Sequence, residues 1–143
     1  MKARDLMTAS DLSVLVESAS VQQAAQLMAD NNIGALPVLD DSGKLEGIIT
    51  DRDICCRVVA EGLDYDTPVR EIMTTSVQCV SPDADVQEIE QAMRDRKIRR
   101  VPVVDKENRL QGFVALADLF RHLHGGREEH ELATVVERIS SPD

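Results

Sequence analysis

The first clear pattern of hydrophobic and polar positions, between residues 20 and 32, has the period of an α-helix. Ser20 is a good N-cap, and the polar pair 31–32 ends the stretch that follows it. The apolar positions between them recur at the spacing of one helix face. They are Val21, Ala24, Ala25, Leu27 and Met28. A short apolar stretch at 14–16 precedes the cap. The pattern predicts a short strand followed by an amphipathic helix.

A hairpin follows. Residues 35–39 are all apolar, which is typical of a strand buried on both faces, with Pro37 at an edge or irregular position. Residues 40–43 (Asp-Asp-Ser-Gly) are a turn sequence, and 45–50 read as the returning strand.

A second helix is predicted to begin at the polar segment 50–53 and to close at Gly62. Four apolar side chains are expected on its inward face. They are Ile54, Cys55, Val58 and Val59.

The whole pattern is written twice. Residues 21–54 align with 86–119 without a gap, and 12 of the 34 positions are identical. A strand is expected near 77–80, a returning strand at 110–115, and a helix at 116–123 with three inward side chains. These are Leu119, Phe120 and Leu123. The fold class expected is α/β in two layers, built from two pseudo-symmetric strand–helix–strand–strand–helix repeats.

The amino-acid composition argues against binding to nucleic acids or membranes. The chain has 143 residues, a net charge of −10, 43% hydrophobic residues and only three aromatic side chains. An acidic chain repels nucleic acids and anionic membranes, and few rings leave little for base stacking. No apolar stretch approaches the length of a membrane span, and no signal-peptide pattern opens the chain, so a cytoplasmic location is expected.

Catalytic chemistry is not indicated. No phosphate-binding glycine loop, nucleophile elbow or zinc-protease motif is present. The histidines gather near a glycine pair, at 122, 124 and 130, and are interpreted as solvated. The cysteines are interpreted as small buried hydrophobes, with a zinc or redox role as the alternative. They are Cys55, Cys56 and Cys79. We therefore expect no catalytic residues, no metal site and no enzyme activity.

Two constellations suggest ligand binding. At Thr50 a strand ends in a hydroxyl residue, and Asp53 lies three positions later, in the first turn of a helix. Such a carboxylate can accept bonds from both hydroxyls of a ribose, and Thr50 can reach a phosphate or sugar oxygen. The alternative is a threonine cap followed by acids that complement the helix dipole.

The second constellation is basic. Five of the chain's sixteen basic residues lie within 94–100. Arg99 and Arg100 enter an apolar strand, and because neighbouring strand residues face opposite ways, one of them is expected to point inward or into a cleft. A buried arginine needs an anion, such as a phosphate or a carboxylate. A solvated rim with a local salt bridge is the alternative.

Together these features resemble a tandem pair of CBS domains, the Bateman module. The resemblance rests on Met-Thr at 7–8 and 73–74, on the strands at 33–38 and 98–103, and on two Gly-to-Asp segments. These segments are Gly47–Asp53 and Gly112–Asp118. It covers about residues 1–124, as CBS repeats 1–65 and 66–124, and is similar to stand-alone CBS-pair proteins.

The resemblance implies repeats packed sheet to sheet, a homodimer, and an adenosine ligand in the clefts between the repeats. AMP, ADP, ATP or S-adenosylmethionine would be the ligand, and no obligatory cofactor is implied. Asp53 and Asp118 would bind ribose and Thr50 would add a hydroxyl contact. The remaining contacts would flank the base and phosphate. They are Ile33, Gly34, Ala35, Ile98, Arg99, Arg100 and, more weakly, Arg52.

The expected function is a non-enzymatic sensor that acts through dimer shape or a regulated protein partner. The alternative is a constitutive dimeric scaffold with empty clefts, which Ala115 favours because it replaces the hydroxyl residue in the second repeat. Beyond the repeats, 125–143 carries four apolar residues on one helical face and is predicted to dock on its own module or on the dimer partner.

Overall fold

The computed structural model describes residues 1–122. They form two compact units. The first, called here the repeat-1 unit, comprises Ser13–Val77. The second, the repeat-2 unit, comprises Met1–Leu12 together with Gln78–His122 of the described residues. The tail predicted to dock as a helix lies outside the described residues.

These units do not follow the repeat boundaries predicted at 1–65 and 66–124. Met1–Leu12 lies at the start of the predicted first repeat but belongs to the repeat-2 unit. Residues 66–77 lie at the start of the predicted second repeat but belong to the repeat-1 unit. Each unit therefore combines most of one repeat with the opening segment of the other.

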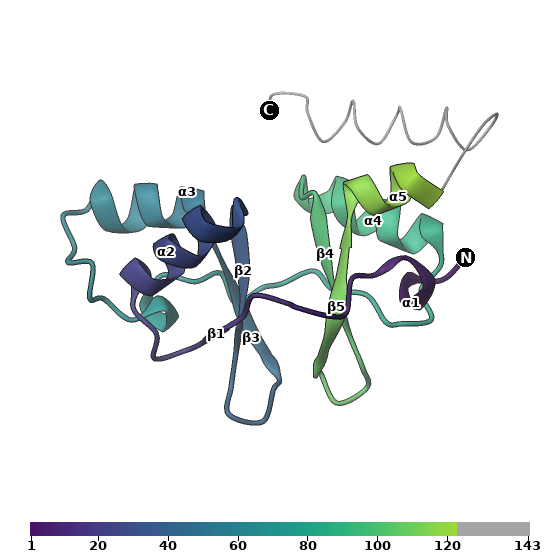
Figure 1. Cartoon of the computed structure of the whole chain (residues 1–143), viewed down its shortest axis with the longest axis horizontal. Helices are drawn as coiled ribbons and strands as arrows, with labels where there is room; N and C mark the ends of the chain where they lie inside the picture. Colours follow the sequence, from purple (N-terminus) through teal and green to yellow (C-terminus); the bar gives the residue numbers. More distant parts are fainter. Residues whose placement is uncertain (123–143) are drawn as a thin grey trace. The chain divides into compact units, whose positions relative to one another are not determined.

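The repeat-1 sheet has three strands, in the order β1-β2-β3. They are β1 (Leu15–Val16), β2 (Ala35–Leu39) and β3 (Leu45–Thr50). β1 runs parallel to β2, and β2 and β3 form the predicted antiparallel hairpin (Figure 1). The Asp40 carboxylate accepts the N–H groups of Lys44 and Ser42 and the Ser42 hydroxyl in the turn, and these bonds lower the pKa of Asp40.

Pro37 lies in the middle of the central strand, rather than in an edge strand. Its partner Ile48 directs its N–H and carbonyl to Thr74, at 2.9 Å each, and so away from Pro37. The pairing of β1 with β2 begins only at Val38. The missing N–H of the proline therefore costs neither neighbour a hydrogen bond.

The helices of the repeat-1 unit are α2 (Val21–Asn31), α3 (Asp51–Ile54), a π-helical turn at Cys55–Val59 and a 3-10 turn at Val69–Glu71. Ser20 caps α2 by accepting the Gln23 N–H at 3.1 Å, as predicted. Asn32 ends α2 in the left-handed conformation, with φ of 53°.

The repeat-2 unit contains α1 (Ala3–Leu6), α4 (Val86–Arg96), β4 (Arg100–Val104), β5 (Leu110–Ala115) and α5 (Leu116–His122). β4 and β5 repeat the antiparallel hairpin. The strand predicted near 77–80 is reduced to one parallel bridge, Val80 to Val103. The mixed α/β class is confirmed, with a shorter first strand in the second repeat.

Each unit has its own core. The repeat-1 core is built on Leu36, Val38, Ile49, Ala24, Val21, Val58 and Val69, with others. The repeat-2 core is built on Val101, Val103, Val114, Ile89, Met93, Leu119 and Leu6, with others. Equivalent strand positions, such as Leu36 and Val101, are completely buried in both. The apolar positions that recur in the two sequence repeats are therefore the positions that form the core of each unit.

A Met-Thr segment completes each hairpin. Thr8 exchanges two backbone hydrogen bonds with Phe113 of β5, at 2.8 and 3.0 Å, in the repeat-2 unit. In Figure 1 the N-terminal segment runs along β5 on its way from α1. Thr74 makes the same exchange with Ile48 of β3 in the repeat-1 unit.

Several helix positions predicted to face inward are exposed. Cys55, Val59, Phe120 and Ala25 all lie on the surface, with Val59 at 71% and Phe120 at 47% exposure. After α3 the backbone continues as a π-helix, in which the Ala60 N–H donates to the Cys55 carbonyl at 2.9 Å. Ile54 and Val58 contact the repeat-1 core, and the residues that follow each of them are turned away from it, so the predicted inward face was too wide.

Candidate functional site

The Thr50–Asp53 segment forms a reciprocal cap at the end of β3. The Thr50 Oγ1 accepts the Asp53 N–H at 3.1 Å, and the Asp53 Oδ2 accepts the Thr50 N–H at 2.9 Å. The Asp53 side chain is 12% exposed. The structure therefore shows the helix cap that the sequence offered as the alternative interpretation. The same two hydrogen bonds hold the Thr50 hydroxyl and the Asp53 carboxylate side by side.

Arg57 makes a further contact with the same carboxylate. Its Nε lies 3.8 Å from the Asp53 Oδ1, and its Nη1 donates to the Ile72 carbonyl at 3.0 Å. Ile72 is followed by the Met-Thr segment that pairs with β3. Arg57 thus links the candidate ligand carboxylate to that segment.

The strand entry lies next to this cap. The Asp51 N–H donates to the Gly34 carbonyl at 2.9 Å, and Ala35 pairs with Thr50 across the hairpin. A carbon added at Gly34 would lie 3.0 Å from the Asp51 carboxylate. Gly34 is exposed, and Ile33 is half-buried against the repeat-1 core. The structure thus brings these three predicted residues together with Thr50, and the neighbouring Arg52 is exposed.

The second repeat keeps the carboxylate in a different setting. The Asp118 Oδ2 accepts the Ala115 N–H at 2.8 Å, as Asp53 does in the first repeat. Its Oδ1 accepts a hydrogen bond from, and forms an ion pair with, the Arg121 guanidinium. The Asp118 side chain is only 6% exposed. Both carboxylate oxygens therefore have a partner within the repeat-2 unit.

Arg99 and Arg100 flank the start of β4. The Leu116 N–H donates to the Arg99 carbonyl at 2.8 Å, which repeats the contact between Asp51 and Gly34. Both arginine residues are exposed, so the expectation that one of them points into the core is wrong, and an arginine in a cleft stays a prediction. Because they begin the strand at its solvated end, their charges do not require an anion. Ile98 before them is half-buried against the repeat-2 core.

The predicted residues therefore fall into two groups. The repeat-1 unit holds Thr50, Asp53 and the strand entry around Gly34, and the repeat-2 unit holds Asp118 and the strand entry around Arg99. The sequence interpretation missed Arg57 and Arg121. Their spacing of four and three residues after an aspartate on a helix could have identified both as ion-pair partners.

The cysteines do not match their interpretation as buried hydrophobes. Cys55 and Cys56 are exposed, and only Cys79 is half-buried. Among residues 1–122, no group of three or more His, Cys, Asp or Glu side chains is arranged to hold a metal ion. His124 and His130 lie outside the described residues.

The reactivity of the three cysteine thiols tests which of them are exposed. Burial raises the pKa of the Cys79 thiol, so a smaller fraction is thiolate at pH 8, and the thiolate is the reactive species. We expect iodoacetamide to modify Cys55 and Cys56 several-fold faster than Cys79, with the Cys79 rate rising at higher pH. Peptide mass spectrometry over a time course measures each rate. Equal rates for the three thiols in the folded protein would contradict the assigned burial.

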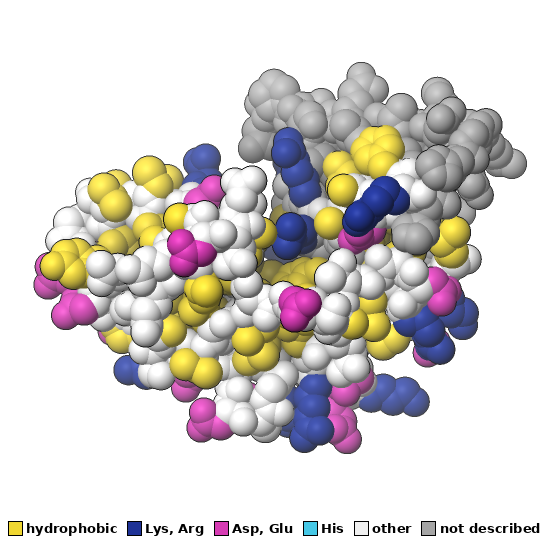
Figure 2. Space-filling view, viewed as in Figure 1, with side chains coloured by type: hydrophobic (Ala, Val, Ile, Leu, Met, Phe, Trp, Pro, Cys, Tyr) yellow, Lys and Arg dark blue, Asp and Glu magenta, His cyan; other side chains and the backbone are white. Residues whose placement is uncertain are grey.

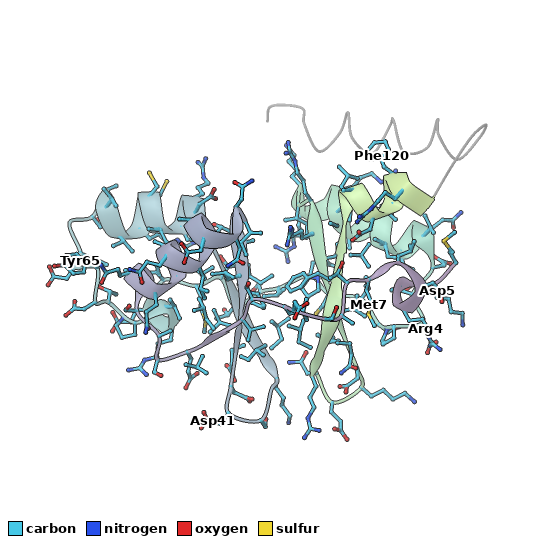
Figure 3. The ribbon with its side chains drawn as sticks, in the orientation of Figure 1. Arg4, Asp5, Met7, Asp41, Tyr65 and Phe120 are labelled. Carbon is cyan, nitrogen blue, oxygen red and sulfur yellow. The ribbon has the colours of Figure 1, made fainter. Side chains whose placement is uncertain are left out.

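Exposed apolar side chains also gather after α3. Val59, Leu63 and Tyr65 are exposed, with Tyr65 at 70%, and they follow the two exposed cysteines. Figure 2 shows hydrophobic side chains on the surface over α3 and the turns that follow it. In Figure 3, Tyr65 points away from the body of its unit.

In the described part of the chain, no helix is long and apolar enough to cross a membrane.

Comparison with known proteins identifies the repeat. A family model for the CBS domain matches the chain twice, over residues 3–59 and 69–125. The chain is 40% identical to Hypoxic response protein 1 of Mycobacterium tuberculosis, over 98% of this chain and 94% of that protein.

Solved structures of similar proteins have the same fold as this chain. A crystal structure of Hypoxic Response Protein I with two coordinated zinc ions has a TM-score of 0.80 and 38% identity, covering 87% of this chain and 100% of that one. CBSX2 in complex with AMP has a TM-score of 0.74 and 27% identity, over 84% of this chain and 93% of that one. The CBS domain pair of MJ0100, in complex with 5-methylthioadenosine and S-adenosyl-L-methionine, has a TM-score of 0.71 and 32% identity, over 85% and 94%.

The two family matches cover most of the chain and coincide with the repeat found in the sequence. The relative and the solved structures match over most of their own lengths as well. This chain therefore belongs to the CBS domain family, as a protein with two CBS domains in tandem.

Proposed function

We propose that this protein is a non-enzymatic regulatory module that binds an adenosine ligand at the Thr50–Asp53 cap. The observation that carries this is the placement of a hydroxyl and a nearly buried carboxylate on one turn, 3.1 and 2.9 Å from each other's backbone N–H. Two similar proteins hold adenosine compounds, CBSX2 with AMP and MJ0100 with S-adenosyl-L-methionine and 5-methylthioadenosine.

The chemistry of the cap suits a ribose. The cap engages one oxygen of Asp53, and within residues 1–122 the contact shown for the other oxygen is the Arg57 Nε at 3.8 Å, beyond hydrogen-bond distance. Ribose hydroxyls can donate to the second oxygen. The cap uses Thr50 Oγ1 as an acceptor, so the Thr50 hydroxyl hydrogen can donate to a ligand oxygen. Arg99, Arg100 and Arg52 stay predictions as phosphate contacts.

Arg57 offers a route from the ligand to the rest of its unit. It joins the Asp53 carboxylate to the Ile72 carbonyl. A ligand that engages Asp53 changes what Arg57 contacts, and so acts on the segment that carries Thr74 along β3. In the proposed function this change alters dimer shape or the affinity for a protein partner.

Isothermal titration with AMP, ATP and S-adenosylmethionine tests the proposal. We expect binding by the natural chain and at least about tenfold weaker binding by Asp53→Asn, because hydrogen bonds to a charged carboxylate are worth about 1.5–3 kcal/mol. Asparagine keeps an oxygen for the Thr50 N–H, so the cap and the fold are retained. Asp41→Asn is the charge-matched control, since Asp41 is exposed at the tip of the β2–β3 hairpin (Figure 3).

No heat with any of the three compounds at millimolar concentration would reject ligand binding. It would favour the constitutive scaffold, which Ala115 and the occupied Asp118 carboxylate already support for the second repeat. Normal binding by Asp53→Asn would instead show that the ligand site lies elsewhere. A scaffold would also capture the same protein partners with and without nucleotide.

A further inference from the structure

The two repeats treat their equivalent carboxylates differently. In the second repeat, Arg121 donates a hydrogen bond to the Asp118 Oδ1 while the Ala115 N–H donates to the Oδ2. In the first repeat only the Oδ2 of Asp53 accepts a hydrogen bond from the cap, and the nearest Arg57 nitrogen stays 3.8 Å from the Oδ1. Within the described residues, both oxygens of Asp118 therefore accept a hydrogen bond, whereas one oxygen of Asp53 does.

The sequence explains the difference. Under the alignment of the repeats, Arg121 corresponds to Cys56, three residues after the aspartate in each case. Cys56 has no guanidinium and is exposed. Arg57 is one position later, where its Nη1 is engaged by the Ile72 carbonyl at 3.0 Å. A single position on the helix thus decides whether an arginine covers the carboxylate.

Competition at Asp118 is unfavourable for a ribose. The guanidinium and the carboxylate are both charged, whereas a ribose hydroxyl is neutral, so a hydroxyl that displaced Arg121 would exchange an ion pair for a hydrogen bond in which only the acceptor is charged. The Asp118 side chain is also less exposed than that of Asp53, 6% against 12%. At Asp53, a ribose hydroxyl competes with the longer Arg57 ion pair at 3.8 Å and displaces no hydrogen bond of the cap.

We infer that Arg121 closes the second repeat to adenosine ligands, so that each chain binds one ligand, through Asp53 in the first repeat. This inference rests on the proposed function, and it concerns which carboxylate is occupied. It also separates the effect of Arg121 from the missing hydroxyl at Ala115. Reopening the second repeat requires removal of the arginine rather than restoration of a threonine.

Equilibrium dialysis with radiolabelled AMP, ATP and S-adenosylmethionine counts the ligands per chain. We expect one per chain for the natural protein and for Ala115→Thr, which restores the hydroxyl but keeps Arg121. Arg121→Gln removes the charge and shortens the side chain while keeping it polar, and is expected to bind two per chain. Adding Asp118→Asn to Arg121→Gln should return the count to one, which assigns the second ligand to Asp118.

The reciprocal variant tests the same idea in the first repeat. Cys56→Arg places a guanidinium three residues after Asp53 and is expected to weaken binding at least about tenfold, the cost of losing a hydrogen bond to a charged group. Cys56→Gln is its uncharged control and should bind normally. Circular dichroism confirms that each variant is folded.

The outcomes separate the inference from the proposed function. Two ligands per natural chain, one per Arg121→Gln chain, or two per Ala115→Thr chain would each overturn the closure by Arg121 while leaving ligand binding in place. No ligand bound to the natural chain or to any variant would overturn the proposed function itself.

Discussion

Replacing Gly112 by alanine should lower the free energy of unfolding by about 1–3 kcal/mol, the usual cost of an added carbon in a packed site. The carbon would lie 2.5 Å from the Thr8 carbonyl oxygen and 3.1 Å from the Met7 sulfur. The Thr8 carbonyl belongs to the backbone and accepts the Phe113 N–H, so it cannot move without breaking the pairing with β5. Urea denaturation followed by circular dichroism measures the change.

Hydrogen exchange identifies where the damage occurs. The Thr8 and Phe113 amides, which donate to each other's carbonyls, should lose protection in Gly112→Ala, because the added carbon forces the N-terminal segment off the strand. Gly34→Ala is the control, since its added carbon meets only the exposed Asp51 carboxylate at 3.0 Å. Its stability should stay within about 0.5 kcal/mol of the natural chain. Equal losses in the two variants would contradict this account.

The same contact exists in the first repeat. A carbon at Gly47 would lie 2.7 Å from the Thr74 carbonyl oxygen and 2.9 Å from the Met73 sulfur. The glycine of each Gly-to-Asp segment is thus needed for the approach of a Met-Thr backbone, and the aspartate six residues later caps the helix. One short segment of sequence therefore serves both the assembly of its unit and the candidate site.

Local pattern predicted the elements of this fold because they are held by local contacts. Ser20 and Thr50 cap the helices that follow them, and the turn after Asp40 joins the strands it was expected to join. The exchange of the leading segments was not predictable in this way. Met-Thr at 7–8 echoes Met-Thr at 73–74, which shows that the two are equivalent, but not which hairpin each one completes.

In the candidate site, too, the features that depend on local contacts were predictable and the others were not. Thr50 and Asp53 are three residues apart on one turn, so their proximity follows from helix geometry alone. The exposure of Arg99 and Arg100 depends on how the end of β4 meets solvent, which strand alternation does not specify. Arg121 changes the second site through a contact of the same local kind as the cap, because a residue three positions after Asp118 lies beside it on the helix.

Helix faces were predicted less well than helix positions. Apolar type alone assigned both Leu119 and Phe120 to the inward face of α5, although neighbouring residues on a helix point about 100° apart. In the structure Leu119 is completely buried, and Phe120 is 47% exposed and lies on the outer side of α5 (Figure 3). The larger side chain therefore contributes less to the core than the smaller one.

Leu119→Ala should therefore destabilise the protein by about 2–5 kcal/mol, the range for removing a buried leucine side chain and leaving a cavity. Phe120→Ala removes more atoms but should cost no more than about 1 kcal/mol, because much of the ring is already in contact with solvent. Urea denaturation of the two variants under identical conditions compares them directly. If Phe120→Ala were the more damaging change, the inward face of α5 would be assigned wrongly.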